Sequence, residues 1–276
     1  MMTSNSKAPL NLIAESGETL PDMDPKAPFL VRGMTVAYHH KPVLWNVSYA
    51  APKGKLTGII GPNGAGKSTF LKAALGLIPK LSGETLVEGK AIKKALSQVA
   101  YVPQRSAVDW DFPATAIDVV LMGLYAQIGW FRWPGKKHRE KAMSCLVAVG
   151  MEDFADRQIG QLSGGQQQRV FLARALAQNA DIYLMDEPFA GVDAATEKAI
   201  IEVLRSLVEQ GKTLLVVHHD LETVREYYSH VLLINGQHVA SGSVETTFTP
   251  ENLQKAYGGR LASSQLDSLS VVGQGA

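Results

Sequence analysis

The sequence predicts an α/β fold with a mostly parallel sheet, an antiparallel β edge subdomain and an α-helical subdomain. From Leu56 onward, short apolar runs are followed by helical periods, a pattern typical of a parallel sheet covered by helices on both faces. Two strand-like runs, 29–38 and 43–51, precede this pattern with only a short turn between them, which favours an antiparallel pair. Helical periodicity within 107–177 predicts the helical subdomain.

The expected elements divide the chain into three parts. Residues 1–27 are polar and rich in proline, so we expect an extension outside the fold. Residues 28–243 should form the main domain, and 244–276 a short helix and a flexible tail. The expected strands are 29–38, 43–51, 56–60, 99–102, 182–185 and 213–217, the expected helices are 114–127 and 137–149, and the first turn holds His39, His40, Lys41 and Pro42.

Length and composition exclude several classes of protein. The 276 residues suffice for one large α/β domain with a helical insert. The hydrophobic share of 46% and charged share of 19% argue against a mostly disordered chain. A net charge of +1 gives no strong field toward nucleic acid or an anionic membrane. Cys145 is the only cysteine, so we expect no internal disulfide, a buried structural thiol and a reducing compartment.

The apolar stretches are too short for a secretory signal or a membrane span. Residues 1–24 carry acidic side chains and no apolar region of useful length. The longest uncharged apolar stretch near the middle, 119–131, is shorter than the ~20 residues that cross a bilayer. We therefore expect a protein that stays in the cytosol and reaches a membrane only through a partner protein.

A glycine-rich segment follows the apolar run 56–60 and precedes a helical pattern. It matches G-x-x-x-x-G-K-S/T with Gly61, Pro62, Asn63, Gly64, Ala65, Gly66, Lys67 and Ser68. Its backbone N–H groups and the following helix N-terminus can hold phosphate oxygens. We expect Lys67 to reach the β- and γ-phosphates, Ser68 to bind Mg²⁺ and Thr69 to contact the α-phosphate. The pattern predicts a phosphate-loop NTPase core; the alternative is a glycine-rich turn with a surface lysine.

Two acids, Asp186 and Glu187, follow the apolar run 182–185 and precede Pro188. The carboxyl ends of parallel strands meet at one edge of a sheet, so we expect both carboxylates beside the phosphate loop. Asp186 is expected to hold Mg²⁺ through water, and Glu187 to act as general base toward the attacking water. Alternation along a strand predicts different tasks for them. The alternative is that they only cap the next helix.

A second potential anion site lies at Ser163, Gly164, Gly165 and Gln166, before another helical pattern. One ATP in one chain does not need two such sites. The run Leu-Ser-Gly-Gly-Gln-Gln-Gln-Arg at 162–169 resembles the signature motif of the ATP-binding cassette (ABC) transporter ATPases. The resemblance implies a head-to-tail homodimer, in which this motif closes on the γ-phosphate at the other subunit's phosphate loop. A glycine-capped helix without a ligand is the alternative.

Further matches run in the order of the ABC family through about 29–242. Tyr38 resembles the aromatic residue that stacks on adenine. Gln104 resembles the glutamine that joins the helical subdomain to the catalytic core and senses Mg²⁺ or water. Asp193 resembles the aspartate of a loop that crosses the dimer interface. The family commonly has serine at the position of Ala190, so no hydroxyl contact is implied there.

Two adjacent histidines compete for one role. His219, before Asp220, resembles the switch histidine that contacts the γ-phosphate. Strand alternation lets only one of the pair face the site, and register with Asp220 favours His219. His218 is then expected to pack in the interior. Neither this pair nor His39–His40 has further ligands at suitable spacing, so we expect a metal site at neither.

The runs 107–113, 118–123 and 188–197 are similar to the ATPases of manganese, zinc and iron importers. Manganese or zinc is therefore the expected cargo, with heme, siderophore, a polar solute or export as alternatives. The expected core residues of the first helix are Ile117, Val120, Leu121 and Leu124. The aromatic candidates for contact with a permease are Trp110, Phe112, Trp130, Phe131 and Trp133. Around Trp133 a solvated loop is the alternative.

The sequence thus predicts an ATPase that uses ATP and Mg²⁺ to drive membrane permease subunits, with an extracytoplasmic solute-binding protein as an indirect partner. Its expected place is the cytoplasmic face of the cell membrane. An ABC ATPase acting on DNA or ribosomes would need paired cassettes or coiled-coil arms and a basic face. A phosphate-loop kinase would lack the signature motif. Residues alone give neither the ion, the direction of transport nor the permease.

Overall fold

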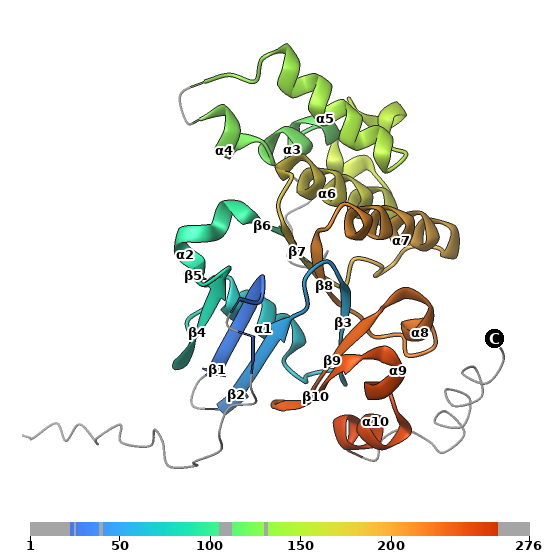
Figure 1. Ribbon diagram of the computed structural model, residues 1–276. Coiled ribbons are helices and arrows are strands. Elements are labelled where there is room, and N and C mark those ends of the chain that lie inside the picture. Colours follow the sequence, from blue (N-terminus) through green and yellow to red (C-terminus); the bar gives the residue numbers. More distant parts are fainter. Residues whose placement is uncertain (1–22, 25, 39–40, 105–111, 130–131, 259–276) are drawn as a thin grey trace, which may run out of the picture.

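The computed structural model describes residues 23–24, 26–38, 41–104, 112–129 and 132–258 (Figure 1). The terminal segments 1–22 and 259–276 lie outside these residues. So do the pair His39–His40 and three of the aromatic candidates, Trp110, Trp130 and Phe131. Within the described ranges, no helix is both long and apolar enough to cross a membrane.

A six-stranded sheet forms the centre of the molecule, in the order β10-β9-β3-β8-β7-β6. Its strands are β3 (Leu56–Ile60), β6 (Val99–Val102), β7 (Ile182–Asp186), β8 (Thr213–Val217), β9 (His230–Ile234) and β10 (His238–Ser243). All neighbours pair in parallel except β9 and β10. Helices cover both faces, which explains why β3, β7 and β8 are continuous apolar runs. The predicted mostly parallel sheet is confirmed.

A smaller antiparallel sheet has the order β2-β1-β4-β5 and confirms the predicted β edge. Its strands are β1 (Phe29–Tyr38), β2 (Lys41–Ala51), β4 (Ser82–Val87) and β5 (Lys90–Ala91). The prediction that Lys41 and Pro42 belong to the turn is wrong, because they pair with Tyr38 and Ala37. Proline is tolerated there since β2 is an edge strand.

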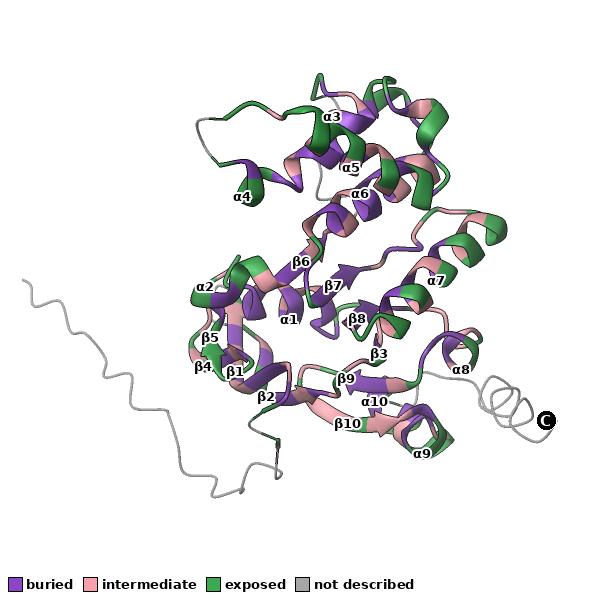
Figure 2. Ribbon diagram, turned by 45° about the horizontal axis from the view of Figure 1, so that its top comes forward, coloured by how far each residue is buried: buried purple, intermediate pink, exposed green. Residues whose placement is uncertain are grey.

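Helix α1 (Lys67–Ala74) lies between the two sheets (Figure 2). Its buried Phe70 and Leu71 share one core cluster with Ile59 of β3 and Leu215 of β8. Alternate strand residues, such as Leu214 of β8, belong to a second cluster on the opposite face. Both sheets thus hold α1, and its first residue lies at the carboxyl edge of the central sheet, where β3 ends.

The helical region contains α3 (Ala116–Met122), α4 (Tyr125–Ile128), α5 (Lys136–Ala148) and α6 (Gly164–Gln178), with 3₁₀ turns at Glu152–Phe154 and Ile159–Gln161. The prediction of one helix over 114–127 is wrong, because the helix is interrupted between α3 and α4. A Cβ at Gly123 would lie 2.3 Å from the carbonyl oxygen of Arg174, so α6 packs directly on the break. The predicted core residues Ile117, Val120, Leu121 and Leu124 are all buried.

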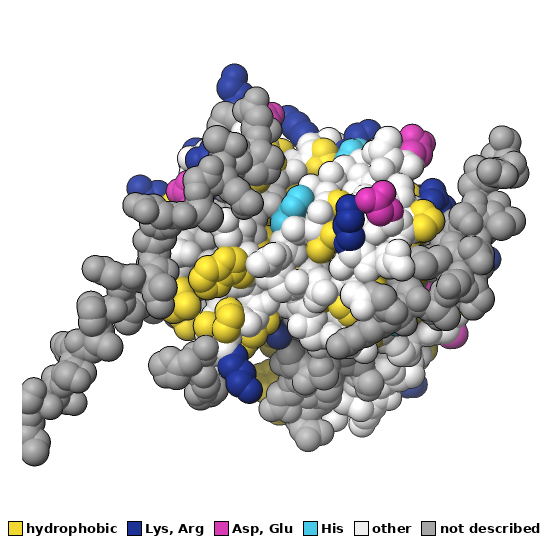
Figure 3. Space-filling view, turned by 90° about the horizontal axis from the view of Figure 1, so that it is seen from below, with side chains coloured by type: hydrophobic (Ala, Val, Ile, Leu, Met, Phe, Trp, Pro, Cys, Tyr) yellow, Lys and Arg dark blue, Asp and Glu magenta, His cyan; other side chains and the backbone are white. Residues whose placement is uncertain are grey.

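The remaining helices after α6 share a core cluster with it on one face of the central sheet and end the described chain (Figure 1). They are α7 (Ala194–Glu209), α8 (Val224–Tyr227), α9 (Val244–Thr247) and α10 (Pro250–Tyr257), while α2 (Ile92–Ala95) and a 3₁₀ turn (Leu96–Gln98) precede β6. On the face seen in Figure 3, the Lys and Arg side chains of the described residues are scattered. This distribution fits the net charge of +1.

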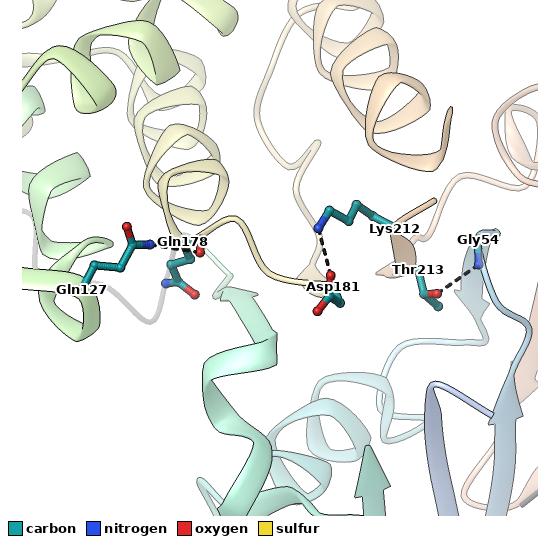
Figure 4. A network of polar contacts seen from close by, with 6 residues as sticks. All are labelled: Gly54, Gln127, Gln178, Asp181, Lys212 and Thr213. Atoms are coloured by element: carbon teal, nitrogen blue, oxygen red, sulfur yellow. Dashed lines mark hydrogen bonds and ion pairs between the residues drawn. The ribbon is translucent and has the colours of Figure 1, made fainter. Parts of the chain in front are cut away.

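Polar contacts join the amino ends of the central strands (Figure 4). Lys212 Nζ lies 2.9 Å from Asp181 Oδ1, which ties the starts of β8 and β7 together. The Gly54 N–H donates to Thr213 Oγ1 over 3.1 Å and ties β8 to the turn before β3. These contacts hold the strands at the edge opposite to their carboxyl ends.

Candidate active site

The predicted phosphate loop, the two acids, Gln104 and the histidine pair lie where four neighbouring parallel strands end. The carboxyl ends of β3, β8, β7 and β6 and the loops after them carry the phosphate loop, the histidine pair, the two acids and Gln104, in that spatial order. Parallel strands place all their carboxyl ends at one edge of the sheet, where ligands of such folds bind. Residues far apart in the sequence therefore meet at this edge.

The phosphate loop connects β3 to α1, as its motif requires. Gly66 is the N-cap of α1 with φ 92°, and a Cβ there would lie 2.5 Å from Leu44 Cδ2. At Gly61 a Cβ would lie 2.0 Å from the carbonyl oxygen of Ile234. Only glycine fits both positions. The buried Lys67 Nζ donates to the carbonyl oxygens of Gly61, at 2.7 Å, and Pro62, at 3.0 Å, so the loop wraps around the lysine.

Asp186 and Ser68 form a candidate Mg²⁺ site. The Ser68 hydroxyl donates to Asp186 Oδ1 over 2.7 Å. Oδ2 of the buried Asp186 has no hydrogen-bond partner within the described part of the chain. Burial raises the pKa of Asp186, and the Ser68 hydrogen bond opposes this shift. A free carboxylate oxygen beside a hydroxyl suits Mg²⁺, which prefers oxygen ligands and keeps several waters.

Glu187 lies just beyond β7 and turns toward Gln104. Its Oε2 accepts a hydrogen bond of 2.7 Å from Gln104 Nε2. Its φ of 52° is left-handed, a conformation that costs free energy for a non-glycine residue and clusters at functional sites. Because β7 ends at Asp186, Glu187 does not continue the strand. The reason given for the prediction, that strand alternation separates the two acids, is therefore wrong. The turn in the backbone separates them.

Electrostatics place Lys67 near both acids. Burial lowers the pKa of Lys67, while the negative charges of Glu187 and Asp186 raise it. The lysine and the two carboxylates therefore lie close enough to interact. A group of one cation and two anions at the base of a phosphate loop can hold a polyphosphate and a positively charged counterion together.

The structure separates the two histidines. His218 is buried, with 2% of its surface exposed, and its Nε2 lies 2.7 Å from Thr223 Oγ1. His219 is exposed. Both follow β8, which ends at Val217, so strand alternation does not apply to them. Burial lowers the pKa of His218 to about 4. Only His219 of the two is free to contact a ligand from the solvent side, which supports the predicted choice.

The buried His218 makes the stability of the fold sensitive to acid. Its folded pKa of about 4 lies below the ~6.5 of an unfolded histidine, so protonation favours the unfolded chain. Its contribution is complete above about pH 6.5 and is lost as the pH falls toward 4. When the pH falls from 8 to 5, we expect protonation of His218 to lower the free energy of unfolding by about 2 kcal/mol.

Urea denaturation at these two pH values, for wild type and His218→Gln, measures this loss. The wild type should lose about 2 kcal/mol more than the variant, because glutamine does not titrate. An equal loss in both proteins would show that His218 does not carry the effect.

The signature segment gathers with the predicted interface loop. Ser163 Oγ accepts from the Gln166 N–H over 3.4 Å, and Gln166 Oε1 accepts from the Ser163 N–H over 2.9 Å, so the two residues cap α6. A Cβ at Gly165 would lie 3.5 Å from Val192, beside the loop that leads into α7. Ser163 itself is exposed. Its hydroxyl therefore lies at a solvent-facing helix N-terminus.

Asp193 is the N-cap of α7. Its Oδ1 accepts from the Thr196 N–H over 2.7 Å, and this hydrogen bond lowers the pKa of Asp193. Tyr38 ends β1 with 46% of its surface exposed, which leaves its ring available for stacking. Sequence reasoning missed Thr223, the partner of His218, because a threonine at the start of a short helix carries no functional signal of its own.

Comparisons with known proteins agree with this geometry. A family model described as ABC transporter matches residues 44–190. The zinc transport system ATP-binding protein TroB of Treponema pallidum is 59% identical over 234 residues, which cover 85% of this chain and 88% of that protein. The manganese transport system ATP-binding protein MntB of Bacillus subtilis is also 59% identical over 234 residues, covering 85% and 94%.

Solved structures share the fold. A nucleotide-free ATP-binding cassette from an ABC transporter superposes with a TM-score of 0.71 at 25% identity, covering 88% of this chain and 98% of that one. A dimeric bacterial ABC transporter cassette has a TM-score of 0.70 at 29% identity, covering 78% and 98%.

Proposed function

The chain belongs to the ABC transporter family, and from this premise we propose that it is the ATP-hydrolysing subunit of a manganese or zinc importer. The observation that carries the catalytic part is the hydrogen bond between Gln104 and Glu187 at the end of β7, beside Asp186 and Ser68. The relatives named for zinc and manganese transport, at 59% identity, support the cargo.

Each residue at the strand ends has a task in this proposal. Lys67 and the N–H groups of 61–69 hold the phosphates, and His219 contacts the γ-phosphate. Glu187 accepts a proton from the attacking water, which Gln104 helps to orient through its hydrogen bond to the same carboxylate. Bound Mg²⁺, held by Ser68, Asp186 and Gln104, would neutralise negative charge on the β- and γ-phosphates. Tyr38 stacks on the adenine.

The second anion site implies a second subunit. Ser163 caps a helix of 15 residues and is exposed, so it can accept a phosphate that its own chain does not supply. We propose a head-to-tail homodimer in which two ATP molecules lie between phosphate loops and signature segments, with Asp193 at the interface. A dimeric bacterial ABC transporter cassette of the same fold supports the formation of a dimer. A two-fold axis makes both sites equivalent.

A groove in the helical region is the proposed contact with the permease at the cytoplasmic face of the membrane. Its volume is about 1050 Å³, and Phe112, Tyr125 and Trp133 line it. These three side chains are 55%, 59% and 93% exposed, far more than their core neighbours in α3. Aromatic anchors of this kind carry much of the binding energy at protein interfaces. The exposure of Trp133 also fits the predicted alternative of a solvated loop.

Tyr125→Glu should uncouple transport from ATP hydrolysis. A carboxylate in place of an aromatic anchor should weaken binding of the permease by about 2 kcal/mol, or roughly 30-fold, while the ATP site is untouched. In vesicles with the assembled transporter, ATP-driven uptake of Mn²⁺ and Zn²⁺ should fall as the bound fraction of the ATPase falls. The isolated chain should still hydrolyse ATP at the wild-type rate.

Tyr125→Phe is the matched control and should transport normally. If the wild-type assembly moves neither metal, the proposed cargo is wrong. If Tyr125→Glu transports as well as wild type, the groove is not the contact with the permease.

A further inference from the structure

His218 is a buried polar side chain that the catalytic tasks above do not use. Its ring lies edge-on to Phe189, with centroids 5.5 Å apart, and 5.3 Å from the ring of Tyr228. Tyr227 closes the cluster at 6.2 Å. The cluster lies directly behind the exposed His219, whose ring is 6.0 Å from that of His218. An aromatic or aliphatic side chain would fill the same space without a polar atom.

The polar contact of His218 ties down the loop that carries His219. His218 Nε2 lies 2.7 Å from Thr223 Oγ1, and this oxygen lies 3.3 Å from Asp220 Oδ2 and 3.4 Å from the Asp220 carbonyl oxygen. We assign the single hydroxyl hydrogen of Thr223 to Asp220, and with this assignment Thr223 accepts from His218. The imidazole thus carries its hydrogen on Nε2. This hydrogen bond joins Thr223, at the far end of the 219–223 loop, to His218, the residue that follows β8.

The same ring contacts the segment that carries Glu187, the proposed general base. Phe189 lies two residues after Glu187 and packs its buried ring against the imidazole. One side chain therefore contacts both the 187–189 segment and the 219–223 loop. The contact on one side is apolar, and the contact on the other is a hydrogen bond.

We propose that His218 is a positioning residue for ATP hydrolysis, which fixes His219 relative to Glu187 by holding the 219–223 loop through Thr223 while it packs on Phe189. This inference rests on the proposed function, specifically on contact of His219 with the nucleotide. Burial lowers the pKa of His218 to about 4, so the ring is neutral at physiological pH. Nδ1 of His218 has no partner within the described part of the chain, a cost that an apolar residue would avoid.

The test compares His218→Leu, His218→Gln, Thr223→Val and the double variant that combines His218→Leu with Thr223→Val, all in the full chain. Glutamine can place an amide N–H near the position of Nε2, whereas leucine fills the space without a donor. We expect His218→Leu to lower kcat for ATP about 10- to 100-fold with an unchanged KM, because the misplaced group acts after binding. Thr223→Val should give the same loss, the double variant no further loss, and His218→Gln should recover most of kcat.

The proposal is overturned by a wild-type kcat in His218→Leu, or by an equal loss in His218→Gln that follows the melting temperature. The variant His219→Ala shows whether a negative result concerns His218 alone or the proposed role of His219. If His219→Ala hydrolyses ATP normally, the assignment of His219 is wrong. If His219→Ala is impaired and His218→Leu lowers its kcat further, His218 does not act through His219.

Discussion

Glu187→Gln should lower ATP turnover by about 10²- to 10⁴-fold and leave ATP affinity unchanged, because the amide cannot accept a proton from the attacking water. Glutamine keeps the shape of the side chain. Its amide oxygen can accept the same hydrogen bond from Gln104 Nε2 that the carboxylate accepts at 2.7 Å. The geometry of the site therefore survives, and only the base is lost. Phosphate release measures turnover, and titration calorimetry measures affinity.

The matched control removes the same charge elsewhere. Glu202→Gln on the exposed side of α7 breaks only a surface ion pair with Arg205 and should turn over at the wild-type rate. Full turnover in Glu187→Gln would show that another group takes the proton. Loss of ATP binding in that variant would show instead that Glu187 supports the phosphate site and not the chemistry.

The strands of the site could be predicted from the sequence because both of their faces are buried. The runs 56–60, 99–102 and 213–217 coincide with β3, β6 and β8. Burial of both faces leaves an unbroken apolar run with sharp ends. In contrast, β4 buries only Thr85 and Val87 of its six residues, so its pattern is too weak to mark a strand.

Features that depend on tertiary packing had no signal in the sequence. Glutamate has no preference for left-handed backbone, so the φ of 52° at Glu187 follows from its surroundings and not from its residue type. The break at Gly123 depends on Arg174, which lies far along the chain in α6 and packs its carbonyl group against the glycine.

Ser163→Asp should abolish turnover without unfolding the chain. Aspartate is as good an N-cap as serine, so the start of α6 keeps its cap. In the proposed dimer the new carboxylate would face the γ-phosphate bound to the other subunit. Two like charges about 4 Å apart at an effective dielectric constant of about 20 repel by about 4 kcal/mol, or roughly 10³-fold in turnover. Phosphate release measures this loss, and Ser163→Thr, which keeps the cap and hydroxyl, should stay active.

Mixing two inactive variants tests whether Ser163 acts on its own chain or on another. In a head-to-tail dimer of Ser163→Asp with Glu187→Gln, one composite site carries both changes and the other carries neither. The mixture should therefore regain ATP turnover that neither variant has alone. If Ser163 acted on the phosphate loop of its own chain, every site in the mixture would carry one change and turnover would stay absent. Recovery on mixing thus requires that each active site be built from two chains.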